Sequence, residues 1–198
     1  MRLLNIGCGP PGPSRVDRLF PAPDWQETRM DLDRRTGPDI VGSITDLSML
    51  PDCSYDAVWA SHLLEHLYRH EILGALRQCW RVLMPGGALV AAVPDLQRVC
   101  ELVAADRLEE TIYTVPAGPI TAHDIIFGFG TAISSGNSFM AHRCGFTPTV
   151  LCRDLQGAGF DPILVRRQSI LELYAVAYRP SSDGRYINGP FSSASGAA

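Results

Sequence analysis

The feature that most constrains the fold of this chain is the apolar run Leu3–Ile6, which is followed by two glycines, Gly7 and Gly9. Glycine lets a backbone turn tightly and come close to a bound molecule, because it carries no side chain. In open α/β sheets, ligands bind at the carboxyl edge of the strands. The sequence therefore predicts a ligand site directly after its first strand.

Strand-like and helix-like segments alternate along the rest of the chain, which favours an α/β protein with a mostly parallel sheet. We expect about seven strands, the last two forming a C-terminal antiparallel hairpin, in a single domain over residues 1–179. The expected strands are Arg2–Ile6, Glu27–Asp31, Asp39–Gly42, Asp56–Ala60, Ala88–Val93, Asp161–Gln168 and Glu172–Arg179. The expected helices are Ser14–Phe20, Tyr68–Leu83, Leu96–Leu108 and one that runs from Thr147 to Gly157.

Residues 96–146 fit this alternation least well. The stretch Thr114–Asn137 is rich in Gly, Pro, Ser and Thr and is expected to be irregular. A long irregular segment inside a compact domain is usually functional or mobile. The tail Pro180–Ala198 consists largely of Ser, Gly and Ala and is expected to be disordered.

Composition narrows the possible functions. The net charge of −4 argues against a generally basic nucleic-acid surface. The six cysteines contain no C-x-x-C pair, so we expect reduced thiols in a cytoplasmic protein and no zinc bound through cysteine. No apolar run approaches the roughly 18 residues that span a membrane, and the first strand begins too early to leave room for a signal peptide.

The glycine turn admits a dinucleotide interpretation. Residues Gly7–Gly12 satisfy G-x-G-x-x-G, and Asp31 follows at about the spacing of 20 residues that such a site would have. A pyrophosphate needs amide donors at a helix N-terminus, however, and Pro10, Pro11 and Pro13 remove three of them. A nicotinamide or flavin enzyme is therefore disfavoured.

A second motif suggests a metal. The segment from His62 to His66 fits H-x-x-E-H, which places two imidazoles on one helical face with Glu65 between them. It follows a buried strand directly and has no distinctive motif for a third ligand. We favour the interpretation that His66 is packed and hydrogen-bonded near the sheet edge, and we expect no metal.

A third interpretation rests on four segments, which together cover more of the chain than either motif above. They are Leu4–Gly9, Met30–Asp33, the stretch from Asp46 to His66, and Trp80–Gly87. Their sequences closely resemble the ordered motifs of class I S-adenosylmethionine-dependent methyltransferases, in particular small enzymes of the type 11 kind. The resemblance runs from residue 3 to about residue 95 and implies a three-layer Rossmann-like fold.

The resemblance also implies a cofactor, S-adenosylmethionine, which has no phosphate and so tolerates the prolines of the loop. Asp31 would accept both ribose hydroxyls, with Asp33 as the alternative. Asp46 and Leu47 would frame the adenine, and Ser61 and His62 would lie beside the sulfonium. The cofactor-binding residues implied in this way are Asn5, Ile6, Gly7, Cys8, Gly9, Asp31, Leu32, Asp46, Leu47, Ser61 and His62.

Two departures from the family pattern bear on the site. Asn5 stands where many members carry an acidic residue, so it would hydrogen-bond the amino group of the cofactor without neutralising it. The helix that usually precedes the first strand and covers the cofactor has no counterpart here, since only Met1 and Arg2 come before the strand. We expect the insert, residues 96–146, to supply that cover together with the acceptor pocket.

The expected reaction is transfer of a methyl group to an oxygen, nitrogen or carbon atom, with a small molecule favoured as the acceptor. His123 and His142, both in the insert, are the candidate general bases, because an imidazole titrates near neutral pH. The competing hypothesis is a catalytically inactive cofactor-binding module or partner subunit. Assembly into a homodimer stays open.

Overall fold

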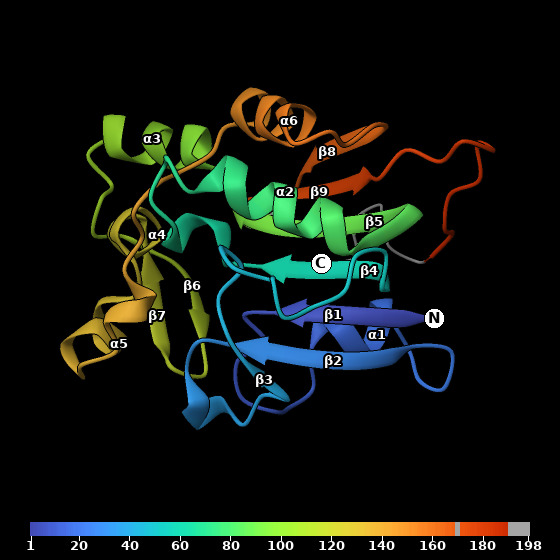
Figure 1. Cartoon of the computed structure of the whole chain (residues 1–198). Coiled ribbons are helices and arrows are strands. Elements are labelled where there is room, and N and C mark those ends of the chain that lie inside the picture. Colours follow the sequence, from blue (N-terminus) through green and yellow to red (C-terminus); the bar gives the residue numbers. More distant parts are fainter. Residues whose placement is uncertain (169–170, 190–198) are drawn as a thin grey trace.

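The computed structural model describes residues 1–168 and 171–189, and a seven-stranded sheet lies at its centre (Figure 1). The strand order is β3-β2-β1-β4-β5-β9-β8. The first five strands in this order are parallel, β9 runs antiparallel to β5, and β8 runs antiparallel to β9. The strands are β1 (Arg2–Ile6), β2 (Gln26–Asp31), β3 (Ile40–Val41), β4 (Tyr55–Ser61), β5 (Leu83–Pro94), β8 (Ile163–Arg167) and β9 (Glu172–Tyr178). The expected fold class, with its closing antiparallel hairpin, is confirmed.

Helices cover both faces of this sheet. Alternation along β1 directs Leu3 to one face and Leu4 to the other. Leu3 joins a hydrophobic core with α1 (Arg15–Leu19), whereas Leu4 joins a larger core to which α2 (Ile72–Val82) and α6 (Pro148–Gly157) contribute. Ser14 caps α1 in a capping box. No helix among residues 1–168 and 171–189 is long and apolar enough to cross a membrane.

Three short 3-10 helices, η1 (Arg34–Thr36), η2 (Leu64–His66) and η3 (Ser138–Met140), lie in the connections. The segment η2 follows β4 directly, so its side chains lie at the carboxyl edge of the sheet. A tight turn of this kind at the end of a buried strand is a common place for functional side chains.

The insert is ordered, and the expectation of an irregular stretch over Thr114–Asn137 is wrong. It contains α3 (Leu96–Ala104), the hairpin β6 (Thr111–Val115) and β7 (Gly118–Thr121), and the helices α4 (Ala122–Phe127) and α5 (Gly130–Ser134). These elements gather at the carboxyl ends of β1, β2 and β4 (Figure 1). A small hydrophobic cluster of its own holds the insert together, which the polar composition of the stretch conceals.

Some element boundaries also differ from the expected ones. The strand β5 begins at Leu83, five residues before the expected Ala88, and continues directly from α2. Within residues 180–189 of the tail that was expected to be disordered, the ring of Tyr186 contacts that of Tyr178, and the amide of Ile187 donates to the carbonyl oxygen of Gly86 at 3.0 Å. The rest of that predicted tail, residues 190–198, falls outside the described residues.

Candidate functional site

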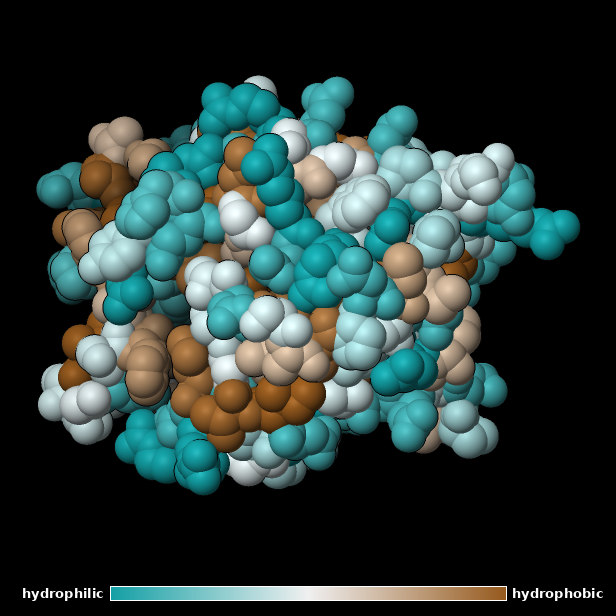
Figure 2. Space-filling view, viewed as in Figure 1, coloured by the Kyte–Doolittle hydropathy of each residue, from teal (hydrophilic) through white to brown (hydrophobic). Residues whose placement is uncertain are grey.

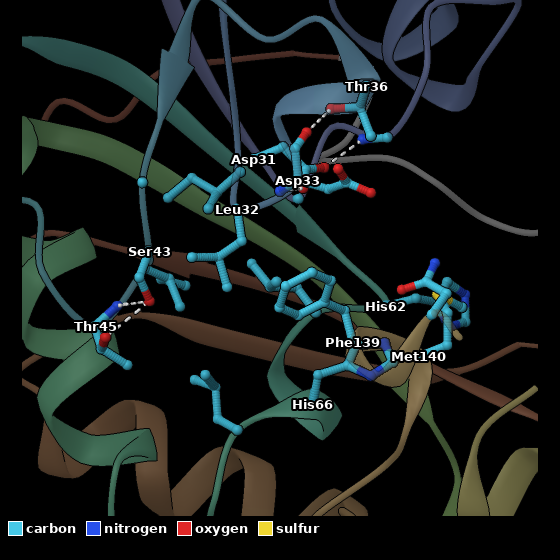
Figure 3. Close-up of a pocket in the computed structure, with 18 of the residues that line it drawn as sticks. Asp31, Leu32, Asp33, Thr36, Ser43, Thr45, His62, His66, Phe139 and Met140 are labelled. Atoms are coloured by element: carbon cyan, nitrogen blue, oxygen red, sulfur yellow. Dashed lines mark hydrogen bonds between the residues drawn. The ribbon is translucent and has the colours of Figure 1, made fainter. Parts of the chain in front are cut away.

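A pocket of about 330 Å3 lies at the carboxyl ends of β1 and β2 and extends under the insert. Figure 3 shows Asp31 and Asp33 on one side of it, Ser43 and Thr45 on another, and His62 with insert residues opposite. On the face seen in Figure 2, hydrophobic surface gathers over β3 and the loop that follows. The ligand site expected after the first strand therefore has a cavity in the structure.

The glycine turn forms the floor of this pocket. Gly7 and Gly9 both line it and have φ angles of +70° and +61°, which residues with side chains rarely adopt. A Cβ atom on Gly7 would lie 3.0 Å from Cδ1 of Leu63. The guanidinium group of Arg29 donates to the carbonyl oxygen of Gly9 at 2.5 Å and holds the turn from below.

Asp31 is the last residue of β2, and Asp33 follows the strand. Both line the pocket, but their surroundings differ. Asp31 accepts the amide of Gly9 on one carboxylate oxygen at 2.9 Å and the amide of Asp33 on the other at 2.8 Å. The carboxylate of Asp33 is bound by Arg35, and this hydrogen-bonded contact holds the pKa of Asp33 below its ordinary value. Each oxygen of Asp31 keeps a lone pair for a further donor.

The loop after β3 reaches the pocket through residues 42–45, and the neighbouring residues proposed to frame adenine do not line it. Asp46 is exposed and accepts the amide of Ser48 at 3.0 Å, whereas Leu47 is fully buried in the main core. The backbone turns between Ser43 and Asp46, which directs the later residues away. Neither Asp46 nor Leu47, the residues expected to frame the adenine, lines this pocket.

Asn5 does not face the pocket, contrary to its expected role. Its side chain is 6% exposed and its Nδ2 atom donates to Oε1 of Glu27 at 2.7 Å. Alternation in β1 places Asn5 on the opposite face from Ile6, which does line the pocket. Of the other implied residues, Leu32 and His62 line this pocket, whereas Cys8 and Ser61 do not.

His62 lies at the end of β4 between two carboxylates. Its Nε2 atom is 3.0 Å from Glu172 and its Nδ1 atom is 3.3 Å from Glu65. Burial lowers the pKa of His62, but the hydrogen bond to Glu172 and the charge of Glu65 outweigh it and raise the pKa to about 10. The imidazole is therefore cationic at neutral pH. Glu172 also pairs with Arg15 at 2.8 Å.

Glu172 and Arg15 were not expected at this site from the sequence. Glu172 is the first residue of the otherwise apolar strand β9 and is almost fully buried. An acidic residue that opens a buried strand is the one local signal for such a position, since buried carboxylates need a partner. Nothing in the sequence near Arg15 indicates that it reaches across to β9.

A second pocket of about 160 Å3 adjoins the first and shares His62, His66 and Met140 with it. Its other walls come largely from the insert and include Tyr113 and His142. Burial holds the pKa of His142 below its ordinary value, so the ring is neutral at neutral pH.

The other candidate base, His123, is not brought to either pocket. It is exposed, and its ring packs against that of Phe127 with the centroids 4.9 Å apart. Four other insert residues line the first pocket, namely Asn137, Phe139, Met140 and Arg143. The insert therefore forms walls of both cavities.

Comparisons with known proteins agree with this arrangement. Residues 4–91 match the family model described as a methyltransferase domain. A structure of an S-adenosylmethionine-dependent methyltransferase from Methanosarcina mazei is 18% identical, with a TM-score of 0.60, over 91% of this chain and 93% of that one. The search of curated proteins found no match.

Two further structures contain cofactor or product. One is the 1,6-didemethyltoxoflavin-N1-methyltransferase of Burkholderia thailandensis with its substrate and S-adenosylhomocysteine bound, at 15% identity and a TM-score of 0.56. The other is human N-acetylserotonin methyltransferase in complex with S-adenosylmethionine, at 14% identity and a TM-score of 0.55. Each match covers 91% of this chain, but only 71% and 48% of those proteins, respectively.

The strand order and the glycine turn followed by an acidic strand end define the architecture of class I methyltransferases. The resemblance deduced from the sequence is confirmed by the match of residues 4–91 to the methyltransferase-domain model and by the fold shared with methyltransferases of known structure. The same matches support S-adenosylmethionine as the cofactor.

Proposed function

We propose that this protein transfers a methyl group from S-adenosylmethionine in the larger pocket to a small-molecule acceptor in the smaller one. The observation that carries this proposal is that the two pockets meet at the same strand edge and share His62, His66 and Met140. When bound, the cofactor supplies a methyl group that its sulfonium already activates. The protein then has to hold two reactants in line, which by itself gives large rate gains.

The residues of the larger pocket fit this cofactor. Asp31 keeps a free lone pair on each carboxylate oxygen, which suits the paired hydroxyls of a ribose. Ile44 and Leu63 offer an apolar surface for the adenine, while Ser43 and Thr45 offer hydroxyl groups. A side chain on Gly7 would fill the cradle beside Leu63, so the absence of a Cβ atom there keeps the floor open.

The smaller pocket suits an acceptor that is partly aromatic or apolar and carries a polar reacting atom. Phe129 and Ile120 give it apolar walls, and Tyr113, Asp124 and His142 give it polar groups. The insert would act as the lid and acceptor pocket that the sequence suggested. Of the two candidate bases, His142 is the one placed to act on an acceptor.

Calorimetry with S-adenosylmethionine and S-adenosylhomocysteine tests the first half of the proposal. Binding of both, with about one ligand per chain, is expected. Binding of neither ligand would refute both the enzyme and the alternative of an inactive cofactor-binding module.

Incubation of the protein with metabolite extract and methyl-labelled cofactor tests the second half, since label in a small molecule is expected only of an enzyme. Loss of turnover in His142→Ala, with turnover kept in the matched variant His123→Ala, would support the role of the insert. Equal turnover in both variants and in the wild type would remove His142 from the reaction.

A further inference from the structure

Three side chains converge between the two pockets, and of these only His142 has a chemical role in the proposed methyl transfer. Glu65 and His66 come from η2, and His142 comes from the segment in which the insert returns to the sheet. One ligand atom from each lies within 4.8 Å of the others. Two ligands of one ion, each about 2.1 Å from it, can be up to about 4.2 Å apart. Small side-chain rotations would therefore bring the three onto one ion.

The carboxylate of Glu65 is the strongest indication that something is bound here. The side chain is 1% exposed, and neither carboxylate oxygen receives a hydrogen bond among the described residues. Nδ1 of His62 lies 3.3 Å from Oε1 as an ion-pair partner, which leaves Oε2 without a hydrogen-bond donor among the described residues. A buried carboxylate oxygen without a donor is rare, because removing it from water is costly unless a partner offsets the loss.

One ring nitrogen of each histidine is held by a backbone carbonyl. Nδ1 of His66 lies 3.1 Å from the carbonyl oxygen of Ala141, and Nδ1 of His142 lies 2.9 Å from that of Ile125. A carbonyl oxygen can only accept, so each Nδ1 donates and each Nε2 is the nitrogen left for a metal ion. Metal-binding histidines are oriented by backbone carbonyls in this way.

The backbone fixes the three residues relative to one another. The amides of Arg143 and Cys144 both donate to the carbonyl oxygen of Glu65, at 2.8 and 3.2 Å. The insert closes behind them where Gly128 pairs with Ala141 in an isolated bridge. The cluster is thus held by hydrogen bonds between η2 and the insert, as a preorganised site requires.

We propose that Glu65, His66 and His142 bind one divalent transition-metal ion, with Zn2+ as the best fit. Two imidazoles and a carboxylate, without a thiolate, form a donor set typical of Zn2+ and related ions that keep an open coordination position. This proposal departs from the expectation of no metal. It uses Glu65 and His66 of the motif H-x-x-E-H, but not His62, and takes its third ligand, His142, from the insert.

The role of the ion rests on the proposed function. His66 and His142 both line the acceptor pocket, so the open position would face the acceptor. A metal ion lowers the pKa of a hydroxyl group that ligates it. The acceptors that fit are therefore molecules whose reacting oxygen can bind a metal, such as a phenol or a hydroxy acid.

Metal binding is measured on the whole chain after treatment with a chelator, by calorimetry with Zn2+ and by absorption spectroscopy with Co2+. One ion per chain is expected, and the Co2+ spectrum should lack thiolate charge-transfer bands. That second readout matters because the protein has six free cysteines. A wild-type protein that binds no stoichiometric ion, or binds it through thiolates, would overturn the proposal.

Variants locate the ion. His142→Ala and the isosteric Glu65→Gln should each weaken Zn2+ binding by at least about 10-fold. His123→Ala, in the same insert but away from the cluster, should bind as the wild type does. Equal affinity in His142→Ala and His123→Ala would contradict the assignment. Calorimetry with S-adenosylhomocysteine reports folding in each variant and tests the cofactor pocket separately from the metal.

Discussion

The central sheet and the insert meet at one site, yet different forces hold them together. The sheet has hydrophobic cores on both faces, and all of its strands except the edge strands β3 and β8 are hydrogen-bonded to a neighbour on each side. The insert rests on a cluster of five buried residues, one hairpin and short helices. The cofactor pocket thus stands mainly on a deeply packed scaffold, whereas the acceptor pocket depends on a lightly packed cover. Such a division lets the acceptor side vary without loss of the fold.

The largest effect should separate the two regions by stability. Leu4→Ala removes a fully buried side chain from the main core and should lower the free energy of unfolding by about 2–5 kcal/mol. Ile125→Ala, in the cluster of the insert, should loosen α4 and leave the sheet protected. Denaturant unfolding and hydrogen exchange measure both. Equal loss of protection in β1 from the two substitutions would show that the insert and the sheet unfold as one unit.

The next effect concerns the cofactor. Asp31→Ala should weaken S-adenosylmethionine binding by about 1.5–3 kcal/mol, because it removes charged hydrogen-bond acceptors from the pocket. Asp46→Ala is the matched control, since Asp46 is exposed and does not line the pocket. Phe139→Ala, on the insert side, should have a smaller effect than Asp31→Ala. Calorimetry gives all three values, and a larger loss in Asp46→Ala would restore the role that the sequence suggested for it.

These residues also mark how far the sequence can be interpreted. Local signals predicted the first strand, Leu3–Ile6, and the glycines that follow it directly. A local signal also predicted Asp31, because this charged residue lies at the end of its own strand. Asn5 was misjudged because the face of a strand on which a residue lies depends on the register of the sheet. Its partner Glu27 comes from another strand and could not be identified in advance.

The insert was harder to predict because its contacts are long-range. Its composition indicates a loop, and only the packing of Val99 and Leu171 against Ile120 shows why it is ordered. In the same way, the pair formed by His62 and Glu172 joins residues 110 positions apart. In the proposed metal cluster, two of the three ligands, Glu65 and His66, lie in the motif H-x-x-E-H, for which the sequence favoured no metal, and the third ligand required the fold.

Two glycines, one in each region, give a more local comparison. Gly7→Ala forces a side chain into a left-handed conformation, at a cost of about 1–2 kcal/mol, but the Leu63 side chain that it meets can move. Gly128→Ala would place a Cβ atom 2.0 Å from the carbonyl oxygen of Met140, which cannot move without opening the insert.

The first substitution should therefore weaken cofactor binding and leave Zn2+ binding intact, and the second should do the reverse. Calorimetry with S-adenosylhomocysteine and with Zn2+ measures both, and Gly12→Ala, which meets nothing within 4 Å, is the neutral control. If each substitution weakened the binding of both ligands equally, the two pockets would be coupled more tightly than their separate packing indicates.

The smallest effect depends on pH and should appear in the insert alone. Asp124 accepts hydrogen bonds from the amides of Thr121 and Gly130 and so caps α4. Burial raises the pKa of this carboxyl, but these hydrogen bonds lower it by more, so the pKa in the folded state lies below the ordinary 3.8. The stabilisation is therefore complete above about pH 4 and is lost as the pH falls through the folded pKa. A cap of this kind contributes about 1 kcal/mol.

Hydrogen-exchange protection factors for the α4 amides, corrected for the intrinsic exchange rate, should accordingly drop between neutral pH and about pH 3, while those of β1 stay high. Asp124→Asn removes the charge and should make protection of α4 low at neutral pH and nearly independent of acid. A fall in β1 protection at the same pH as in α4 would mean that acid acts on a carboxylate of the sheet, such as the buried Glu172. Burial raises the pKa of Glu172, but its partners His62 and Arg15 outweigh burial and hold that pKa below its ordinary value. In that outcome the lightly packed insert would not be the first part of the molecule to open.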